Sequence, residues 1–141
     1  MNKQNRRSMR NARRSFTLIE IVVVIVILVT LAGVATPMYM NHLKKANVGA
    51  AKTQINLLED ALSSYRLDVG TYPSDLQGLV QNIDESEKWD GPYIKKIPMD
   101  PWGTPYYYAF PGEHGEYDLV SFGGDKQEGG ENENADLNNW D

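Results

Sequence analysis

Residues 16–43 of this 141-residue chain read FTLIEIVVVIVILVTLAGVATPMYMNHL. From Ile21 to Leu43 no side chain is charged when His42 is counted as neutral, and the block Ile21–Val29 is apolar at every position. As a helix, these 23 positions would span roughly 35 Å, which is enough to cross a bilayer core of ~30 Å. The stretch therefore predicts a membrane-spanning helix near the N-terminus.

The charges on either side of this stretch are unevenly distributed. Residues 1–15 hold six basic residues and no acidic one, whereas the rest of the chain has 8 basic and 19 acidic residues. By the positive-inside rule, the basic segment places the N-terminus in the cytoplasm. The acidic remainder argues against nucleic-acid binding, because phosphates need cations on a folded face. The chain has no cysteine, which excludes disulfides, thiolate metal sites and a lipoprotein anchor.

Glu20 stands one residue before the apolar block. A carboxylate at bilayer depth costs about 2.5–3.5 kcal/mol on insertion scales unless it has a partner, and no cation follows it before Lys44. Headgroups that wet the carboxylate, or a partner in another molecule, would each account for it. A plain single-span anchor explains the length and orientation of the segment but not Glu20. A cleavable secretory signal would have a shorter apolar core and a small-x-small site, and Pro37 is followed by no such site.

After Leu43 the sequence becomes amphipathic. Gly70 and Pro73 then predict the end of the helix near Val69. We therefore divide the chain into a basic leader (1–15), a transmembrane helix (16–43), an amphipathic helix that continues it (44–70) and a region of loops and strands (71–141). Apolar residues recur at spacings of three and four and form one helical stripe, which consists of Val48, Ala51, Ile55, Leu58, Leu62, Tyr65 and Val69.

The C-terminal region predicts a small antiparallel sheet, which makes the fold class α+β. Aromatic and β-branched residues indicate strands at 93–97, 106–110 and 117–122, with a turn at 111–115 between the last two. Residues 77–79 indicate a short helix or turn, and residues 100–103 a tight turn with Trp102 over the core. Because three short strands are not stable alone, we expect them to pack on the helical stripe.

Residues 122–141 hold six acidic residues against one cation, Lys126. Composition alone favours a solvated acidic tail. However, Leu137 and Trp140 follow most of the acids as apolar anchors, and mutual repulsion of the acids would oppose packing unless a cation neutralised them. Oxygen ligands on a flexible loop suit Ca²⁺, although the spacing is not that of an EF-hand.

Candidates for catalysis are few. Only His42 and His114 offer neutral-pH bases, and the chain has no nucleophile elbow, phosphate loop or zinc spacing. We therefore expect that the protein is not an enzyme. A different class, a membrane-anchored Ca²⁺-dependent binding module, would use Tyr106, Tyr107 and Tyr108 as a sugar platform, but packing in a strand and the core is the favoured role for these tyrosines.

The segment Arg14-Ser15-Phe16-Thr17-Leu18-Ile19-Glu20, between a basic leader and an apolar run, resembles the type III signal of type IV pilins and pseudopilins. The resemblance implies cleavage between Ser15 and Phe16 by a prepilin peptidase, which also N-methylates Phe16. It further implies that Glu20 pairs with the N-terminal amine of a neighbouring subunit. The family usually has Gly where this chain has Ser15.

Further motifs are similar to those of the major pseudopilin of type II secretion systems. The resemblance implies a type IV pilin-like fold, a single-pass protein of the bacterial inner membrane and a periplasmic filament of many copies that drives export of folded proteins. The implied partners are minor pseudopilins, the prepilin peptidase and an inner-membrane assembly platform. The motifs are Asp68-x-Gly70-x-Tyr72-Pro73, Gly91-Pro92-Tyr93-Ile94, Pro98-x-Asp100-Pro101-Trp102-Gly103 and Ser121-Phe122-Gly123.

By the same resemblance, Ca²⁺ binds in the C-terminal loop. The implied ligands are the carboxylates of Asp125 and Asp136, with the Phe122 carbonyl and Glu133 or Asn134 as further candidates. A surface-displayed type IV pilin or a competence pseudopilin is an alternative within the superfamily. Many surface pilins close this loop with a disulfide, and a chain without cysteine cannot do so.

Overall fold

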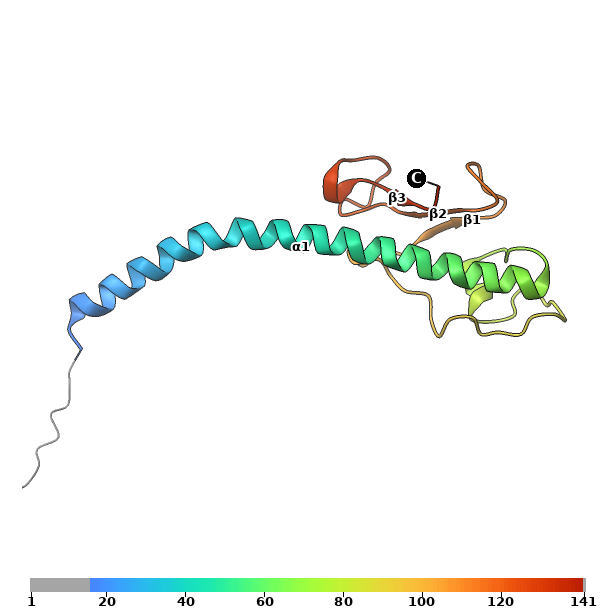
Figure 1. The fold of residues 1–141 in the computed structure, drawn as a ribbon, viewed down its shortest axis with the longest axis horizontal. Helices are drawn as coiled ribbons and strands as arrows, with labels where there is room; N and C mark the ends of the chain where they lie inside the picture. The colour runs from blue at the N-terminus through green and yellow to red at the C-terminus, as the bar shows by residue number, and fades with distance from the viewer. Residues whose placement is uncertain (1–15, 141) are drawn as a thin grey trace, which may run out of the picture. The chain divides into compact units, whose positions relative to one another are not determined.

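The computed structural model describes residues 16–140 of the chain, which divides into two compact units, residues 1–39 and residues 40–141. The division falls inside the long helix α1, which runs from Leu18 to Val69 and is followed by two short 3-10 helices and three strands (Figure 1). The predicted long helix is confirmed, and the leader, residues 1–15, lies outside the described residues. The other elements are η1 (Leu76–Leu79), β1 (Tyr107–Ala109), β2 (Asp118–Ser121), η2 (Asn132–Asn134) and β3 (Leu137–Asn138).

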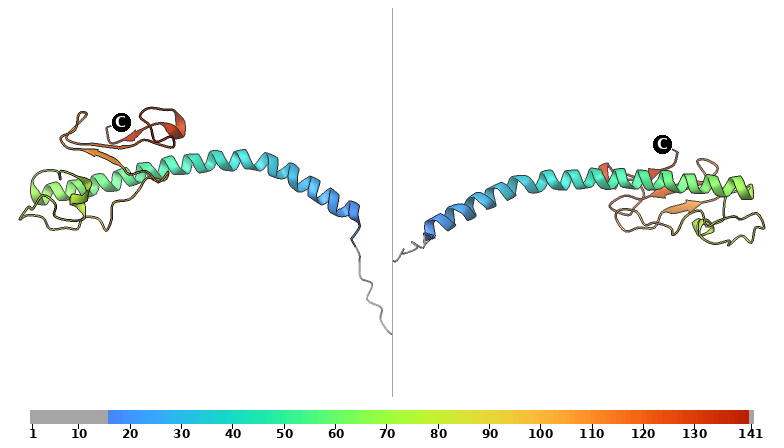
Figure 2. Two further views of the ribbon diagram at one scale, coloured as in Figure 1. Left: turned by 180° about the vertical axis from the view of Figure 1, so that it is seen from behind. Right: turned by 60° about the horizontal axis from the view of Figure 1, so that its bottom comes forward.

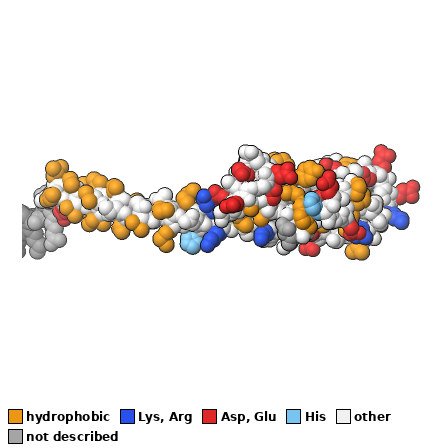
Figure 3. Space-filling model, turned by 90° about the horizontal axis from the view of Figure 1, so that it is seen from above, with side chains coloured by type: hydrophobic (Ala, Val, Ile, Leu, Met, Phe, Trp, Pro, Cys, Tyr) orange, Lys and Arg blue, Asp and Glu red, His pale blue; other side chains and the backbone are white. Residues whose placement is uncertain are grey.

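The first unit consists, in its described part, of the apolar half of α1. Every side chain from Phe16 to Tyr39 is exposed, and by length and composition the helix can cross a membrane. Figure 3 shows hydrophobic side chains over this half of the helix. The hydroxyls of Thr30 and Thr36 donate to the carbonyls of Ile27 and Ala32 at 2.8 and 2.7 Å. These polar groups are therefore satisfied within the helix, as a lipid environment requires.

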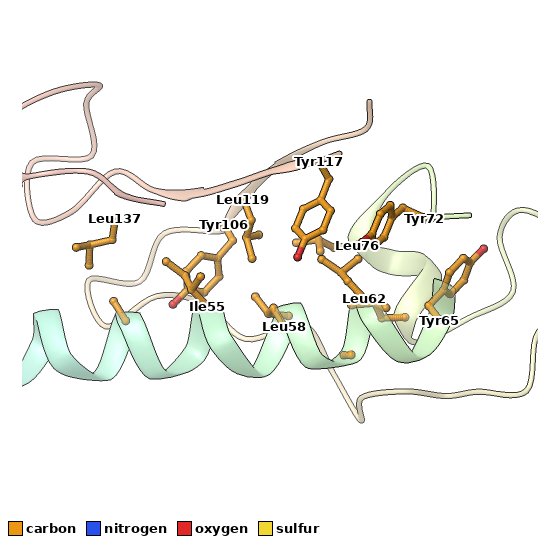
Figure 4. Packing of buried hydrophobic residues seen from close by; sticks show 13 residues of the cluster. Ile55, Leu58, Leu62, Tyr65, Tyr72, Leu76, Tyr106, Tyr117, Leu119 and Leu137 are labelled. Atoms are coloured by element: carbon orange, nitrogen blue, oxygen red, sulfur yellow. The ribbon is translucent and has the colours of Figure 1, made fainter. Parts of the chain in front are cut away.

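The core of the second unit lies between the second half of α1 and the sheet. The predicted stripe is confirmed, because five of its residues are buried and Val48 and Val69 pack against the core from its margins. In Figure 4 the side chains of Ile55, Leu58 and Leu62 project from α1 toward Tyr106, Tyr117 and Leu119. The five buried stripe residues are Ala51, Ile55, Leu58, Leu62 and Tyr65.

The three strands form an antiparallel sheet in the order β1-β2-β3, alongside the second half of α1 (Figure 2). Tyr108 pairs with Leu119, and Ser121 pairs with Leu137. Tyr117 and Leu119 belong to the core cluster, while Asp118 and Val120 line a pocket on the other face. This alternation is what the two-residue period of a strand dictates.

The strand predicted at 93–97 is wrong. The N–H groups of Tyr93 and Ile94 both donate to the carbonyl of Leu79, at 2.8 and 3.3 Å, so the backbone bends here and does not extend along a neighbour. The third strand is β3, which lies in the acidic C-terminal loop. The short helix predicted at 77–79 is confirmed as η1. The turn at 100–103 is confirmed by the Gly103 N–H, which donates to the Asp100 carbonyl at 2.9 Å.

The tyrosines at 106–108 do not form a platform. Tyr106 is buried, and its hydroxyl donates to Gln54 of α1 at 2.6 Å. Tyr108 packs against the core, and its hydroxyl donates to the Pro73 carbonyl at 2.9 Å. Core packing is therefore right for these two, and strand packing for Tyr107, which lies in β1, pairs with Val120 and is 51% exposed.

Candidate assembly segment and C-terminal loop

Glu20 lies in the first turn of α1 and is exposed. Thr17 precedes the helix and caps it, because its hydroxyl oxygen accepts the Glu20 N–H at 3.3 Å. Within residues 16–140, the carboxylate of Glu20 has no hydrogen bond and no ion pair. An acid at a helix N-terminus interacts favourably with the helix dipole. For an exposed side chain such as Glu20, the free energy gained in this way is small beside the cost of placing the charge in a membrane.

The predicted processing site adjoins this turn. Phe16 is the first described residue, and its side chain is 75% exposed. Ser15, and with it the bond that the prepilin peptidase is predicted to cut, lies outside the described residues. The cleavage between Ser15 and Phe16 therefore stays a prediction from the sequence.

The two ends of the C-terminal loop meet where residues 122–124 contact residues 133–136, a place we call the neck of the loop. The Gly124 N–H donates to the Glu133 carbonyl at 2.9 Å. Gly123 has a φ of +64°, and a Cβ at this position would stand 2.9 Å from the carbonyl oxygens of Glu133 and Ala135. Glycine is therefore required here for the two ends of the loop to meet.

Among the candidate ligands, Asp136 has a carboxylate oxygen free to contact a cation. Its Oδ2 accepts the Gly129 N–H at 2.8 Å, while its Oδ1 is buried and has no hydrogen-bond partner among the described residues. An unpaired buried carboxylate oxygen costs free energy that a cation would recover. The neighbouring Leu137 is buried in the core, as the prediction of an apolar anchor requires.

The other candidate ligands are placed less favourably. Asp125 is exposed, and its Oδ1 accepts the Gln127 N–H at 3.2 Å. The Glu133 carboxylate is paired with Lys44 of α1 at 2.7 Å, an ion pair that the sequence analysis missed. Phe122 and Asn134 are partly buried in the neck of the loop. Within residues 16–140, no three or more acidic or histidine side chains gather into a metal-binding group, so a cation here would depend on backbone carbonyls as well.

The chain end is attached to the β1–β2 turn. The rings of His114 and Trp140 stack with centroids 4.1 Å apart, and His114 Nδ1 lies 3.0 Å from Asp118 Oδ2. Burial alone would raise the pKa of Asp118, but hydrogen bonds from the His114 ring and from the N–H groups of Glu113 and His114 lower the pKa below its ordinary value. Trp140 is thus the second apolar anchor of the loop, and its stack gives His114 a structural role that the sequence did not indicate.

Comparison with known proteins identifies both parts of the chain. Residues 38–140 match the family model for type II secretion system protein G, and residues 10–36 match the prokaryotic N-terminal methylation motif. The type II secretion system core protein G of Pseudomonas aeruginosa is 44% identical over 140 residues, covering 94% of this chain and 98% of that protein. The protein of the same name from Vibrio cholerae is 42% identical over 131 residues, covering 89% of this chain and 90% of that protein.

A solved structure agrees with these matches. The crystal structure of the major pseudopilin from the type 2 secretion system of enterohaemorrhagic Escherichia coli superposes with a TM-score of 0.59 at 32% identity, covering 72% of this chain and 92% of that one. The expected pseudopilin fold is thereby confirmed, and the surface pilins and the binding module are set aside. The chain belongs to the family of type II secretion system protein G, the major pseudopilins.

Proposed function

We propose that this chain is the repeating subunit of a periplasmic pseudopilus, a helical filament whose growth pushes folded proteins across the outer membrane. The observation that carries this proposal is the exposed first half of α1, whose apolar side chains are not covered by any described part of the chain. A surface of this kind requires lipid or other copies of itself. When a subunit moves from the membrane into a filament, its apolar half of α1 leaves lipid and packs against other copies of the same helix.

Glu20 sets the register in which one subunit packs against the next in the filament. After cleavage before Phe16, each copy would carry an N-terminal amine one turn from its own Glu20. In a filament the amine of one copy meets the Glu20 carboxylate of the next. Each charge then offsets the desolvation cost of the other, and a copy out of register leaves both unpaired. The pair therefore rewards the correct position more than it adds overall stability.

The orientation follows from the charge distribution. The basic leader stays in the cytoplasm, the apolar half of α1 crosses the inner membrane once, and residues 40–141 fold in the periplasm. A prepilin peptidase removes the leader and methylates Phe16. An assembly platform in the inner membrane then extracts the subunit, and minor pseudopilins form the filament with it. The energy for extraction comes from the platform's ATPase, and this chain supplies register, packing and length.

Calcium closes the C-terminal loop in this proposal. Asp136 would hold the ion with its unpaired Oδ1, and Asp125 with the oxygen that does not accept the Gln127 N–H. The Phe122 carbonyl and Asn134 are further candidates, whereas the carboxylate of Glu133 would first have to leave Lys44. When bound, the cation neutralises the acidic loop and gives it one packed conformation.

The mature N-terminus tests the proposal for processing and assembly. Intact-mass and peptide mass spectrometry of the protein extracted from membranes is expected to show a chain that begins at N-methylated Phe16. Phe16→Ala serves as a control for the methylated residue, because its mature chain would have a different first residue. A filament built from chains that still begin at Met1 would contradict the proposal.

A further inference from the structure

Asp100 is a buried carboxylate with three hydrogen-bond donors. Its Oδ1 accepts the N–H groups of Trp102 and Thr104 at 3.1 and 2.7 Å, and its Oδ2 accepts the Ser121 hydroxyl at 2.7 Å. Asp100 is 4% exposed and Ser121 is fully buried. Buried carboxylates persist where donors satisfy them. Here the donors come from two segments, so Asp100 ties the turn 100–104 to the end of β2.

The same turn touches the neck of the C-terminal loop. A Cβ at Gly124 would lie 3.2 Å from Trp102 Nε1, so the indole stands directly beside the backbone there. The Gly124 N–H donates to the Glu133 carbonyl, whose oxygen would lie 3.4 Å from the same Cβ. Gly124 therefore contacts both the turn and the returning end of the loop.

Ser121 lies at the end of the pairing between β2 and β3, next to the C-terminal loop. It is the last residue of β2 and pairs with Leu137 of β3 in an antiparallel register. In that register the next residue along the chain, Phe122, comes opposite Asp136, which precedes Leu137. The Ser121 position therefore fixes the two strand ends that carry the Phe122 carbonyl and the Asp136 carboxylate.

We infer that Asp100, through its hydrogen bond to Ser121, is a positioning residue for the C-terminal loop and sets the affinity of the loop for Ca²⁺. Asp100 does not touch the cation. Its part is to hold Ser121, and through it the Phe122 and Asp136 strand ends, in the arrangement that the ion needs. This inference rests on the proposed calcium function.

The test removes one hydroxyl. Ser121→Ala in the full chain, kept in detergent micelles, is expected to bind Ca²⁺ about tenfold more weakly in calorimetric titration than the unmodified chain, because the lost hydrogen bond to a charged group no longer holds the strand ends that carry the ligands. Trypsin provides a second readout at Lys126, the cation within the loop. Without Ca²⁺, cleavage after Lys126 is expected to be several-fold faster in Ser121→Ala, because the neck is loosened.

Tyr106→Phe is the matched control. It also removes one hydroxyl, but that hydroxyl donates to Gln54 at 2.6 Å and not to the Asp100 carboxylate. It is expected to leave Ca²⁺ affinity and cleavage after Lys126 unchanged. Asp100→Asn, which keeps the shape of the side chain, takes the place of Ser121→Ala if that variant does not fold, and should weaken Ca²⁺ binding in the same direction.

The outcomes separate the two claims. Equal Ca²⁺ affinity in the unmodified chain and Ser121→Ala overturns the role of Asp100 and leaves the calcium proposal intact. An equal loss in Tyr106→Phe also overturns it, because the effect would then reflect general destabilisation. An unmodified chain that binds no Ca²⁺ overturns the calcium proposal and this inference together.

Discussion

Glu20→Leu is expected to abolish polymerisation of this pseudopilin while the subunit remains inserted in the membrane and folded in its periplasmic unit. Leucine suits the apolar helix better than glutamate, so insertion does not suffer. What is lost is the partner of the next copy's N-terminal amine. Removing one member of a buried ion pair costs about 3–5 kcal/mol, which corresponds to a factor of roughly 10² to 5 × 10³ in the association constant at each contact.

Chemical crosslinking in membranes measures this effect. The unmodified chain is expected to give a ladder of oligomers, and Glu20→Leu only the monomer. Glu87→Leu is a matched control, because Glu87 is an exposed acid in the second unit and the change in charge and size is the same. A ladder from Glu20→Leu as long as that of the control would show that the carboxylate does not set the register.

Calcium is expected to stabilise the unmodified chain strongly, and Asp136→Asn to remove most of that gain. At a free Ca²⁺ concentration of 100 times the Kd, binding adds about 2.7 kcal/mol to the free energy of unfolding. For a folded unit of this size the gain raises Tm by roughly 10–20 °C. Asparagine keeps the shape of the side chain but lacks the negative charge on the unpaired oxygen, so the cation loses its best-placed ligand.

Differential scanning calorimetry with Ca²⁺ and with a chelator measures the shift. Glu128→Gln, a change to an exposed acid in the same loop, is expected to retain the full Ca²⁺ shift. Mg²⁺ is expected to raise Tm only slightly, because it requires near-octahedral geometry and gives up its water ligands reluctantly. An undiminished shift in Asp136→Asn would move the site elsewhere in the loop, and no shift in the unmodified chain would end the calcium proposal.

The long helix could be predicted because its signals are local and repeated. The apolar run and the stripe of three- and four-residue spacings extend over many turns, so each residue supports the same interpretation. β3 could not be predicted in this way. Leu137 and Asn138 form a strand because β2 lies beside them, and nothing in the polar sequence around them alternates. Tyr93–Ile97 has strand-forming residues, but hydrogen bonds to Leu79 bend its backbone.

The candidate sites also differ in whether a local sequence signal reveals them. Glu20 is visible in the sequence because a charge beside an apolar run is rare and costly. The Lys44–Glu133 pair and the Asp100–Ser121 hydrogen bond join residues far apart in the chain, and a single serine in a strand carries no signal of its partner. The one hint for Lys44 was its place as the first cation after the membrane segment.

Coupling of amine to carboxylate across the subunit contact tests the central claim most directly. Filaments assembled from a mixture of ¹⁴N- and ¹⁵N-labelled chains would be treated with a membrane-permeant carbodiimide, which joins an amine to a carboxylate at ion-pair distance, and then digested for mass spectrometry. We predict a crosslink between the Phe16 amine of one isotope and the Glu20 carboxylate of the other. Crosslinks confined to chains of one isotope, or none at Glu20, would contradict the pairing on which this account of assembly depends.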